Sequence, residues 1–85
     1  MTREYLVKYK AGLHARPASL LVKCASNLPN DTKIIYKERA LTLKSIMAVM
    51  SMGIPSGATF EITVPEDDGT IFEEIEAILN EHGVI

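Results

Sequence analysis

Residues 3–28, REYLVKYKAGLHARPASLLVKCASNL, change from a two-residue repeat of apolar side chains to a helical one. Residues 3–9 alternate in the way typical of a strand with one buried face, which consists of Tyr5, Val7 and Tyr9. Only Leu6 departs from this alternation. Residues 17–28 have the spacing of an amphipathic helix, whose apolar stripe consists of Leu20, Leu21, Cys24, Ala25 and Leu28. We therefore expect the chain to begin with a strand followed by a helix.

A hairpin and a short helix are predicted in the middle of the chain. Residues 32–36 and 40–43 are β-favouring runs separated by three charged residues, Lys37, Glu38 and Arg39. This connection lacks the Asn-Gly pair that a tight type I′ turn prefers. Residues 45–53 predict a short helix, because a serine can cap its start and a glycine its end.

The last third of the chain predicts one more strand and one more helix. Apolar residues alternate up to Pro65, at Phe60, Ile62 and Val64. A helical repeat then runs to Gly83 and consists of Ile71, Phe72, Ile75, Ile78, Leu79 and His82. The acidic residues Glu66, Asp67 and Asp68 are interpreted as a lead-in favoured by the positive end of this helix, with a Ca²⁺ site as the alternative.

The predicted order of elements is βαββαβα, which makes this an α+β fold in one domain, residues 1–85. The chain is too short for several parallel crossovers between its strands. One antiparallel sheet with its helices on one face would bury every apolar stripe named above. The core of so small a protein is thin, and we expect no active-site cleft that is enclosed on all sides.

Composition excludes several classes of function. Nine Lys and Arg against eleven Asp and Glu give a net charge of −2, which argues against nucleic-acid binding through bulk positive charge. Cys24 is the only cysteine, so no internal disulfide is possible and a reducing, cytoplasmic location is favoured. The chain has neither an apolar run long enough to insert into a membrane nor the N-terminal pattern of a signal peptide.

The stretch Gly-Leu-His-Ala-Arg-Pro-Ala at residues 12–18 carries the clearest chemical signal. It places an imidazole, that of His14, immediately before a predicted helix start, where unpaired N–H groups and the helix dipole favour anions. A neutral imidazole nitrogen can attack phosphorus, and the guanidinium of Arg16 can bind phosphoryl oxygens. Together these residues predict reversible phosphoryl transfer, in which positioning and charge stabilisation do most of the work.

Plainer interpretations of the titratable residues remain open. A lone histidine such as His14 is more often a cap or a surface residue than a site. A metal role is disfavoured, because His82 is far away in sequence and neither histidine has a cysteine or acidic cluster beside it. His82 fits the C-terminal end of the last helix, and Cys24 fits a small apolar residue of the first.

The segment Lys-Ser-Ile-Met-Ala-Val-Met-Ser-Met-Gly-Ile at residues 44–54 is the second informative stretch. Ser45 is well placed as a helix N-cap, and the helix dipole would also tolerate a phosphate on it. The predicted helix is apolar nearly all round, so its side chains cannot all face one sheet. Either some of them form an exposed docking surface, or the helix is clamped on two sides within the core.

These two segments resemble the active-centre motif and the regulatory-serine segment of the HPr family. Its members are the histidine-containing phosphocarriers of the bacterial phosphoenolpyruvate-dependent sugar phosphotransferase system. The resemblance covers essentially the whole chain, including the βαββαβα order. It implies an open-faced β-sandwich, in which a four-stranded antiparallel sheet is covered on one face by three helices.

The resemblance also implies a role for each matching residue. His14 would accept a phosphoryl group on Nδ1 from Enzyme I and pass it to the IIA domain of a sugar permease. Arg16 would steady the phosphohistidine, and Ala15 and Arg16 would supply backbone N–H groups. Ser45 would be the target of HPr kinase/phosphorylase, a modification that slows transfer from Enzyme I and promotes binding to a CcpA-type repressor. A shared docking patch for partners would consist of Leu20, Ile46, Met47 and Met50. No cofactor is implied, and the chain would be a stoichiometric carrier and not an enzyme.

Two other functions are weighed against this one. The first is an HPr-like regulatory module that acts as a corepressor through phospho-Ser45; the related Crh proteins keep the serine but lack the histidine, so His14 argues against them. The second is a small nucleic-acid binder, disfavoured by the net charge and by the low aromatic content of 6%. The sugars and permeases served, and whether this is a main HPr or a paralogue, are left open.

Overall fold

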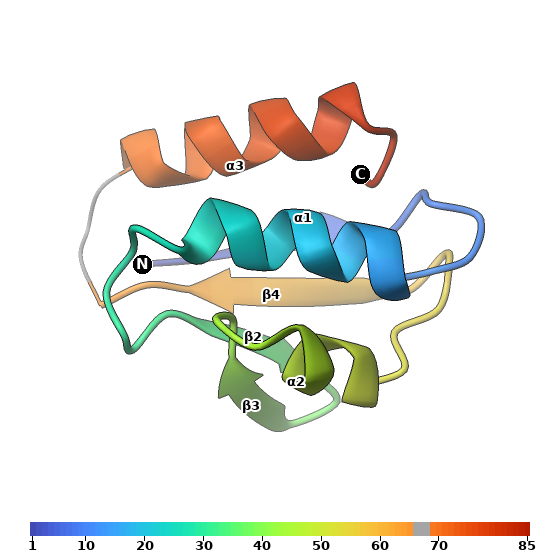
Figure 1. Ribbon diagram of the computed structural model, residues 1–85, viewed down its shortest axis with the longest axis horizontal. Coiled ribbons are helices and arrows are strands. Elements are labelled where there is room, and N and C mark those ends of the chain that lie inside the picture. The colour runs from blue at the N-terminus through green and yellow to red at the C-terminus, as the bar shows by residue number, and fades with distance from the viewer. Residues whose placement is uncertain (66–68) are drawn as a thin grey trace.

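A computed structural model describes residues 1–65 and 69–85, so the acidic segment 66–68 lies outside the described residues (Figure 1). The order of elements is the predicted βαββαβα. The elements are β1 (Thr2–Leu6), α1 (Ala15–Ala25), β2 (Lys33–Tyr36), β3 (Arg39–Thr42), α2 (Ile46–Ser51), β4 (Thr59–Thr63) and α3 (Gly69–Glu81).

The four strands form one sheet in the order β1-β4-β2-β3, and every neighbouring pair is antiparallel. Tyr5 pairs with Phe60, and Ile34 pairs with Ile62, so the inward-facing side chains of three strands lie side by side. The helices lie on the face of the sheet that is toward the viewer in Figure 1. The predicted α+β open-faced sandwich is confirmed.

The core lies between this sheet face and the helices. The strands contribute Tyr5, Phe60 and Ile62, which the sequence singled out, together with Ile34 of β2, and all four are buried. Ala18, Leu21 and Ala25 recur at helical spacing on α1, and Phe72, Ile75 and Leu79 do so on α3. The predicted stripe of α1 is therefore partly wrong, because Leu20, Cys24 and Leu28 are only half-buried beside it.

The first strand is shorter than residues 3–9. It ends at Leu6. Leu6 is 46% exposed, because it occupies an outward-facing position of the strand, where the alternation would place a polar residue. The next two residues leave the sheet ladder but keep partners: the N–H of Val7 donates to Ala58, and that of Lys8 donates to Val84. Val7 itself stays buried, so the alternation continues one step beyond the strand.

The β2–β3 hairpin has a tight two-residue turn although it lacks Asn-Gly. Tyr36 pairs with Arg39, which belongs to β3 and not to the turn. Lys37 and Glu38 have φ angles of 49° and 67°, so both are in the left-handed region that a type I′ turn requires. Neither residue is a glycine or an asparagine, so each adopts this conformation at a cost in conformational energy.

A polar network joins β1 to α3. One carboxylate oxygen of Glu76 accepts hydrogen bonds of 2.8 Å from both Arg3 and the hydroxyl of Tyr5, and the Arg3 guanidinium also lies over the ring of Phe72. Burial acts to raise the pKa of Glu76, but the hydrogen bonds from Tyr5 and Arg3 outweigh it and hold that pKa below its usual value. Burial and then the bond to Glu76 raise the pKa of Tyr5 well above its usual range.

Candidate functional site

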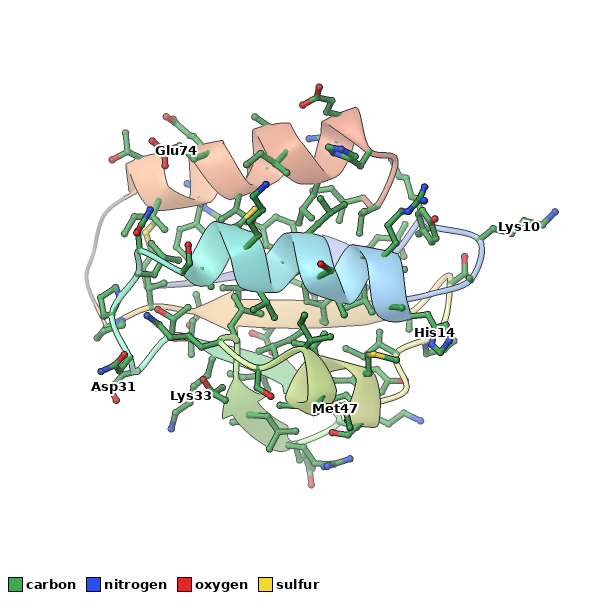
Figure 2. The ribbon with its side chains drawn as sticks, viewed as in Figure 1. Lys10, His14, Asp31, Lys33, Met47 and Glu74 are labelled. Carbon is green, nitrogen blue, oxygen red and sulfur yellow. The ribbon has the colours of Figure 1, made fainter. Side chains whose placement is uncertain are left out.

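His14 stands at the junction between the loop after β1 and helix α1. It is the N-cap of α1, with an extended backbone, and its carbonyl accepts the first helical hydrogen bond from the N–H of Ala18 at 2.9 Å. Its side chain makes no capping bond and is exposed. Figure 2 shows the ring beside the N-terminal end of α1. Neither ring nitrogen forms a hydrogen bond or ion pair with any of residues 1–65 and 69–85.

The first turn of α1, which follows His14 directly in the chain, carries hydrogen-bond donors. In any α-helix the first N–H groups have no carbonyl partner within the helix, and here they belong to Ala15 and Arg16, since Pro17 has no N–H. Pro17 and Ala18 are buried and anchor the helix start on the core. Arg16 is exposed, and no carboxylate among residues 1–65 and 69–85 forms an ion pair with it. The helix start thus presents two N–H groups and one cation for an anion on His14.

A shallow hollow of about 220 Å³ opens beside the His14 ring. Met50, Gly53, Ile54 and Pro55 line one side of it, and these residues come from the end of α2 and the loop that follows. The N–H of Leu13 donates to the carbonyl of Ile54 at 2.9 Å, so this loop is bonded to the residue before His14. Sequence reasoning missed Ile54 and Pro55, because no local pattern links residues so far apart in the chain.

Ser45 is the N-cap of α2, as predicted. Its backbone is extended, and its hydroxyl oxygen accepts a hydrogen bond from the N–H of Ala48 at 3.2 Å. The residue is half-exposed, so its oxygen is both a structural cap and accessible from solvent. The interpretation as a cap needs no phosphate, and it does not conflict with one.

The exposed side of α2 is apolar. Met47 is 78% exposed and Ile46 is 41% exposed, whereas Val49 and Met52 are buried. The helix is therefore not clamped on two sides within the core, because its outer face is exposed (Figure 2). Met50 is half-buried and joins this face to the hollow beside His14.

Leu20 lies in a different hollow from Met50. This second depression, of about 450 Å³ between α1 and α3, is lined by Leu20, Lys23, Cys24, Asn27, Glu74, Ile78 and His82. Of the four predicted docking residues, the structure thus gathers three on α2 and leaves Leu20 on α1, the helix that packs beside it.

Cys24 and His82 keep their structural interpretations. Burial raises the pKa of Cys24, so the thiol is less reactive than a free one. His82 is exposed beyond the last turn of α3, with Nδ1 3.0 Å from the carbonyl of Ile78. Within residues 1–65 and 69–85, no three His, Cys, Asp or Glu side chains gather where they could hold a metal ion. The helices of this same part of the chain are all too short or too polar to cross a membrane.

The family model described as the phosphorylation site of the phosphotransferase-system HPr component matches residues 1–81. The chain belongs to the HPr family. It is 35% identical to the histidine-containing phosphocarrier protein of a Mycoplasma, with a TM-score of 0.88, and the match covers 100% of this chain and 98% of the other. HPr from Bacillus anthracis is 33% identical over 92% of this chain and 94% of its own, with a TM-score of 0.76.

Crh, the catabolite-repression protein of Bacillus subtilis, is also similar in structure. It is 30% identical, the match covers 93% of this chain and 92% of Crh, and the TM-score is 0.67. The fold is therefore that of the HPr phosphocarriers of the phosphotransferase system, and it is shared with Crh.

Proposed function

We propose that this protein carries phosphoryl groups on His14, accepting them from Enzyme I and passing them to the IIA domains of sugar permeases. The observation that carries the proposal is the exposed imidazole at the N-cap of α1, whose side chain makes no capping bond. It is followed in the chain by two N–H groups that have no partner within the helix and by the exposed cation of Arg16. An imidazole that only capped the helix would use its side chain to do so, and this one does not.

The transfer itself needs little more than this arrangement. A ring nitrogen of neutral His14, Nδ1 in our proposal, forms a bond to phosphorus while the bond between phosphorus and the donor breaks. The N–H groups of Ala15 and Arg16 and the Arg16 guanidinium stabilise the charge on the phosphoryl oxygens. In the second step an acceptor nitrogen on the IIA domain forms a bond to phosphorus while the bond between phosphorus and Nδ1 breaks. The electron pair of that bond returns to Nδ1, and His14 leaves as neutral imidazole with its proton on Nε2. The protein is consumed and regenerated in this cycle, so in this proposal it is a stoichiometric carrier and not an enzyme. We place it in the cytoplasm.

The outer face of α2 is the proposed docking surface for these partners. Ile46, Met47 and Met50 of α2 would contact Enzyme I and the IIA domains, together with the half-buried Leu20 of the neighbouring α1. Exposed apolar side chains such as Ile46 and Met47 favour binding of several partners. Met50 supports this placement, since it borders the hollow beside His14.

Ser45 is proposed as the regulatory site on this surface. A kinase such as HPr kinase/phosphorylase would place a phosphate at the start of α2, next to Ile46 and Met47, and so add negative charge where Enzyme I must bind. The same charge would form a site for a CcpA-type repressor. The half-exposed Ser45 and the similarity to Crh favour a second candidate function, in which the protein acts mainly as a corepressor module through phospho-Ser45.

Phosphorylation by purified Enzyme I with labelled phosphoenolpyruvate tests the proposal. We expect one acid-labile phosphate on the wild type and on Ser45→Ala, and none on His14→Ala. Label that persists in His14→Ala would refute the assignment of the site. Absence of label on the wild type, together with ATP-dependent labelling that Ser45→Ala abolishes, would favour the corepressor module.

A further inference from the structure

The backbone just before His14 is held by a loop from another part of the chain. Leu13 is only 2% exposed, so its side chain fixes one side of the active-centre loop in the core. Its N–H donates to the Ile54 carbonyl at 2.9 Å, which fixes the backbone itself. His14 follows directly, and the bond from Ala18 to its carbonyl holds its other side. The imidazole is thus free to react while the backbone that carries it is anchored on both sides.

Gly12 makes this close approach possible. Its φ of +73° lies in the left-handed region, and a Cβ at this position would meet the Ile54 oxygen at 2.5 Å and the Pro55 Cα at 3.0 Å. Ordinary contacts of a Cβ begin at 3.4 Å, so any side chain here would force the two backbone segments apart. Both neighbours are backbone atoms, which cannot rotate away as a flexible side chain can. Gly12 is therefore needed for the approach of the two segments as well as for its own turn.

We propose that the Ile54 carbonyl is the positioning element that sets where the His14 ring lies relative to the N–H groups of Ala15 and Arg16. The Leu13 N–H can approach this carbonyl because residue 12 is a glycine. This inference rests on the proposed carrier function. Phosphoryl transfer requires the attacking nitrogen and the donors to share one phosphoryl group, so a displacement approaching 1 Å slows the reaction strongly. Ile54 and the adjoining Pro55, in the loop between α2 and β4, thereby serve the reaction without touching the phosphoryl group.

Alanine substitution of two glycines separates positioning from backbone strain. Gly57 also has a positive φ, +87°, but a Cβ there would meet no atom within 4 Å. Gly12→Ala and Gly57→Ala therefore place an alanine in the same disfavoured region, and only the first pushes on Ile54. We expect Gly12→Ala to lower kcat for labelling by Enzyme I about 100-fold. We expect KM for the protein to stay the same, because the apolar face of α2 is unchanged, and Gly57→Ala to be labelled like the wild type.

A backbone substitution covers the case in which Gly12→Ala does not fold. Cys24 is the only cysteine, so a synthetic peptide of residues 1–23 can be ligated to an expressed 24–85 fragment. An ester in place of the Leu13 amide removes the N–H that donates to Ile54 and adds no side-chain volume. The matched control is an ester at Val7, which is equally buried and whose N–H donates to Ala58 at the same 2.9 Å. We expect the Leu13 ester alone to lose labelling rate.

The outcomes distinguish this inference from the function on which it rests. No labelling of the wild type refutes the carrier function. The positioning role is refuted if the wild type is labelled and either Gly12→Ala or the Leu13 ester is labelled as fast as its control. That result leaves the carrier function standing. Equal slowing of each variant and its control would also refute positioning, since backbone strain or lost stability alone would then explain it.

Discussion

The hydroxyl of Ser45 has two roles in this account, and substitutions at this one position can separate them. It caps α2 through the hydrogen bond from Ala48 at 3.2 Å, and it is the proposed acceptor of a regulatory phosphate. Loss of an N-cap costs about 1 kcal/mol. Helix α2 has only six residues, so the cap is a large part of its hydrogen bonding. We therefore expect Ser45→Ala to lower the free energy of unfolding by about 1 kcal/mol, or the midpoint of thermal unfolding by roughly 4–8 °C.

Ser45→Asn and Ser45→Asp both keep a side-chain oxygen at the cap, so we expect both to be as stable as the wild type. Only Asp adds a negative charge beside Ile46 and Met47. Labelling by Enzyme I should therefore slow for Ser45→Asp and stay unchanged for Ser45→Asn, although the two side chains have nearly the same shape.

Urea unfolding followed by circular dichroism measures the first effect, and the rate of phosphoryl transfer from Enzyme I measures the second. Ser51→Ala is the matched control on the same helix, because its hydroxyl donates to the carbonyl of Ala48 at 2.7 Å and caps no N–H group. Equal stability of Ser45→Ala and wild type would refute the capping argument. Equal transfer rates for Ser45→Asp and Ser45→Asn would refute the electrostatic basis of the regulation.

Three further predictions concern stability and can be checked by urea unfolding. Replacing Lys37 and Glu38 by Asn and Gly should stabilise the hairpin by about 1–2 kcal/mol, because both positions have a positive φ; no gain would contradict the assigned turn. Thr32→Val should stabilise by about 1 kcal/mol, since the Thr32 hydroxyl is buried and has no hydrogen-bond partner among residues 1–65 and 69–85; a loss of stability would contradict this. Tyr5→Phe should cost about 1 kcal/mol at pH 7 through its bond to ionised Glu76. Because folding lowers the pKa of Glu76, the stability that its ionised form contributes is complete above the unfolded pKa of about 4.3 and is lost as the pH falls through the folded pKa. If Tyr5→Phe costs as much stability at pH 3 as at pH 7, the proposed dependence on ionised Glu76 is wrong.

The element order could be read from the sequence because burial leaves a local periodic trace. Tyr5 and Val7 alternate toward the core, Leu6 breaks the pattern, and in the structure Leu6 is exposed while its neighbours are buried. The start of α1 was less predictable. Proline suits several first-turn positions, and the helix in fact begins two residues before Pro17, which makes His14 itself the cap.

Features that depend on contacts between distant segments left no such trace. Arg3 and Tyr5, near the start of the chain, both donate hydrogen bonds to Glu76, near its end. Neither segment alone has a sequence pattern that indicates these hydrogen bonds. The turn at Lys37 and Glu38 is tight because the register of β2 and β3 leaves only two residues to connect them, which overrides their local preference. Leu20 and Cys24 are half-buried because they border the hollow between α1 and α3 and not the sheet.

The same division applies to the site. His14, Arg16 and Ser45 could be singled out because a cap and a helix start are local features with characteristic residues. Ile54 could not, since only the fold brings its carbonyl to Leu13. Gly12 belongs to the stretch 12–18 that the sequence singled out, but the contact that excludes a side chain at this position is visible only in three dimensions.

The most direct test of the central claim follows a single phosphoryl group through the protein. The chain is labelled once with Enzyme I and phosphoenolpyruvate, separated from both, and mixed with a purified IIA domain. We predict that the label is on His14, and that it leaves this protein and appears on the IIA domain in equal amount. Label that is found on another residue, or that stays on the protein in the presence of every IIA domain of its organism, would contradict the account.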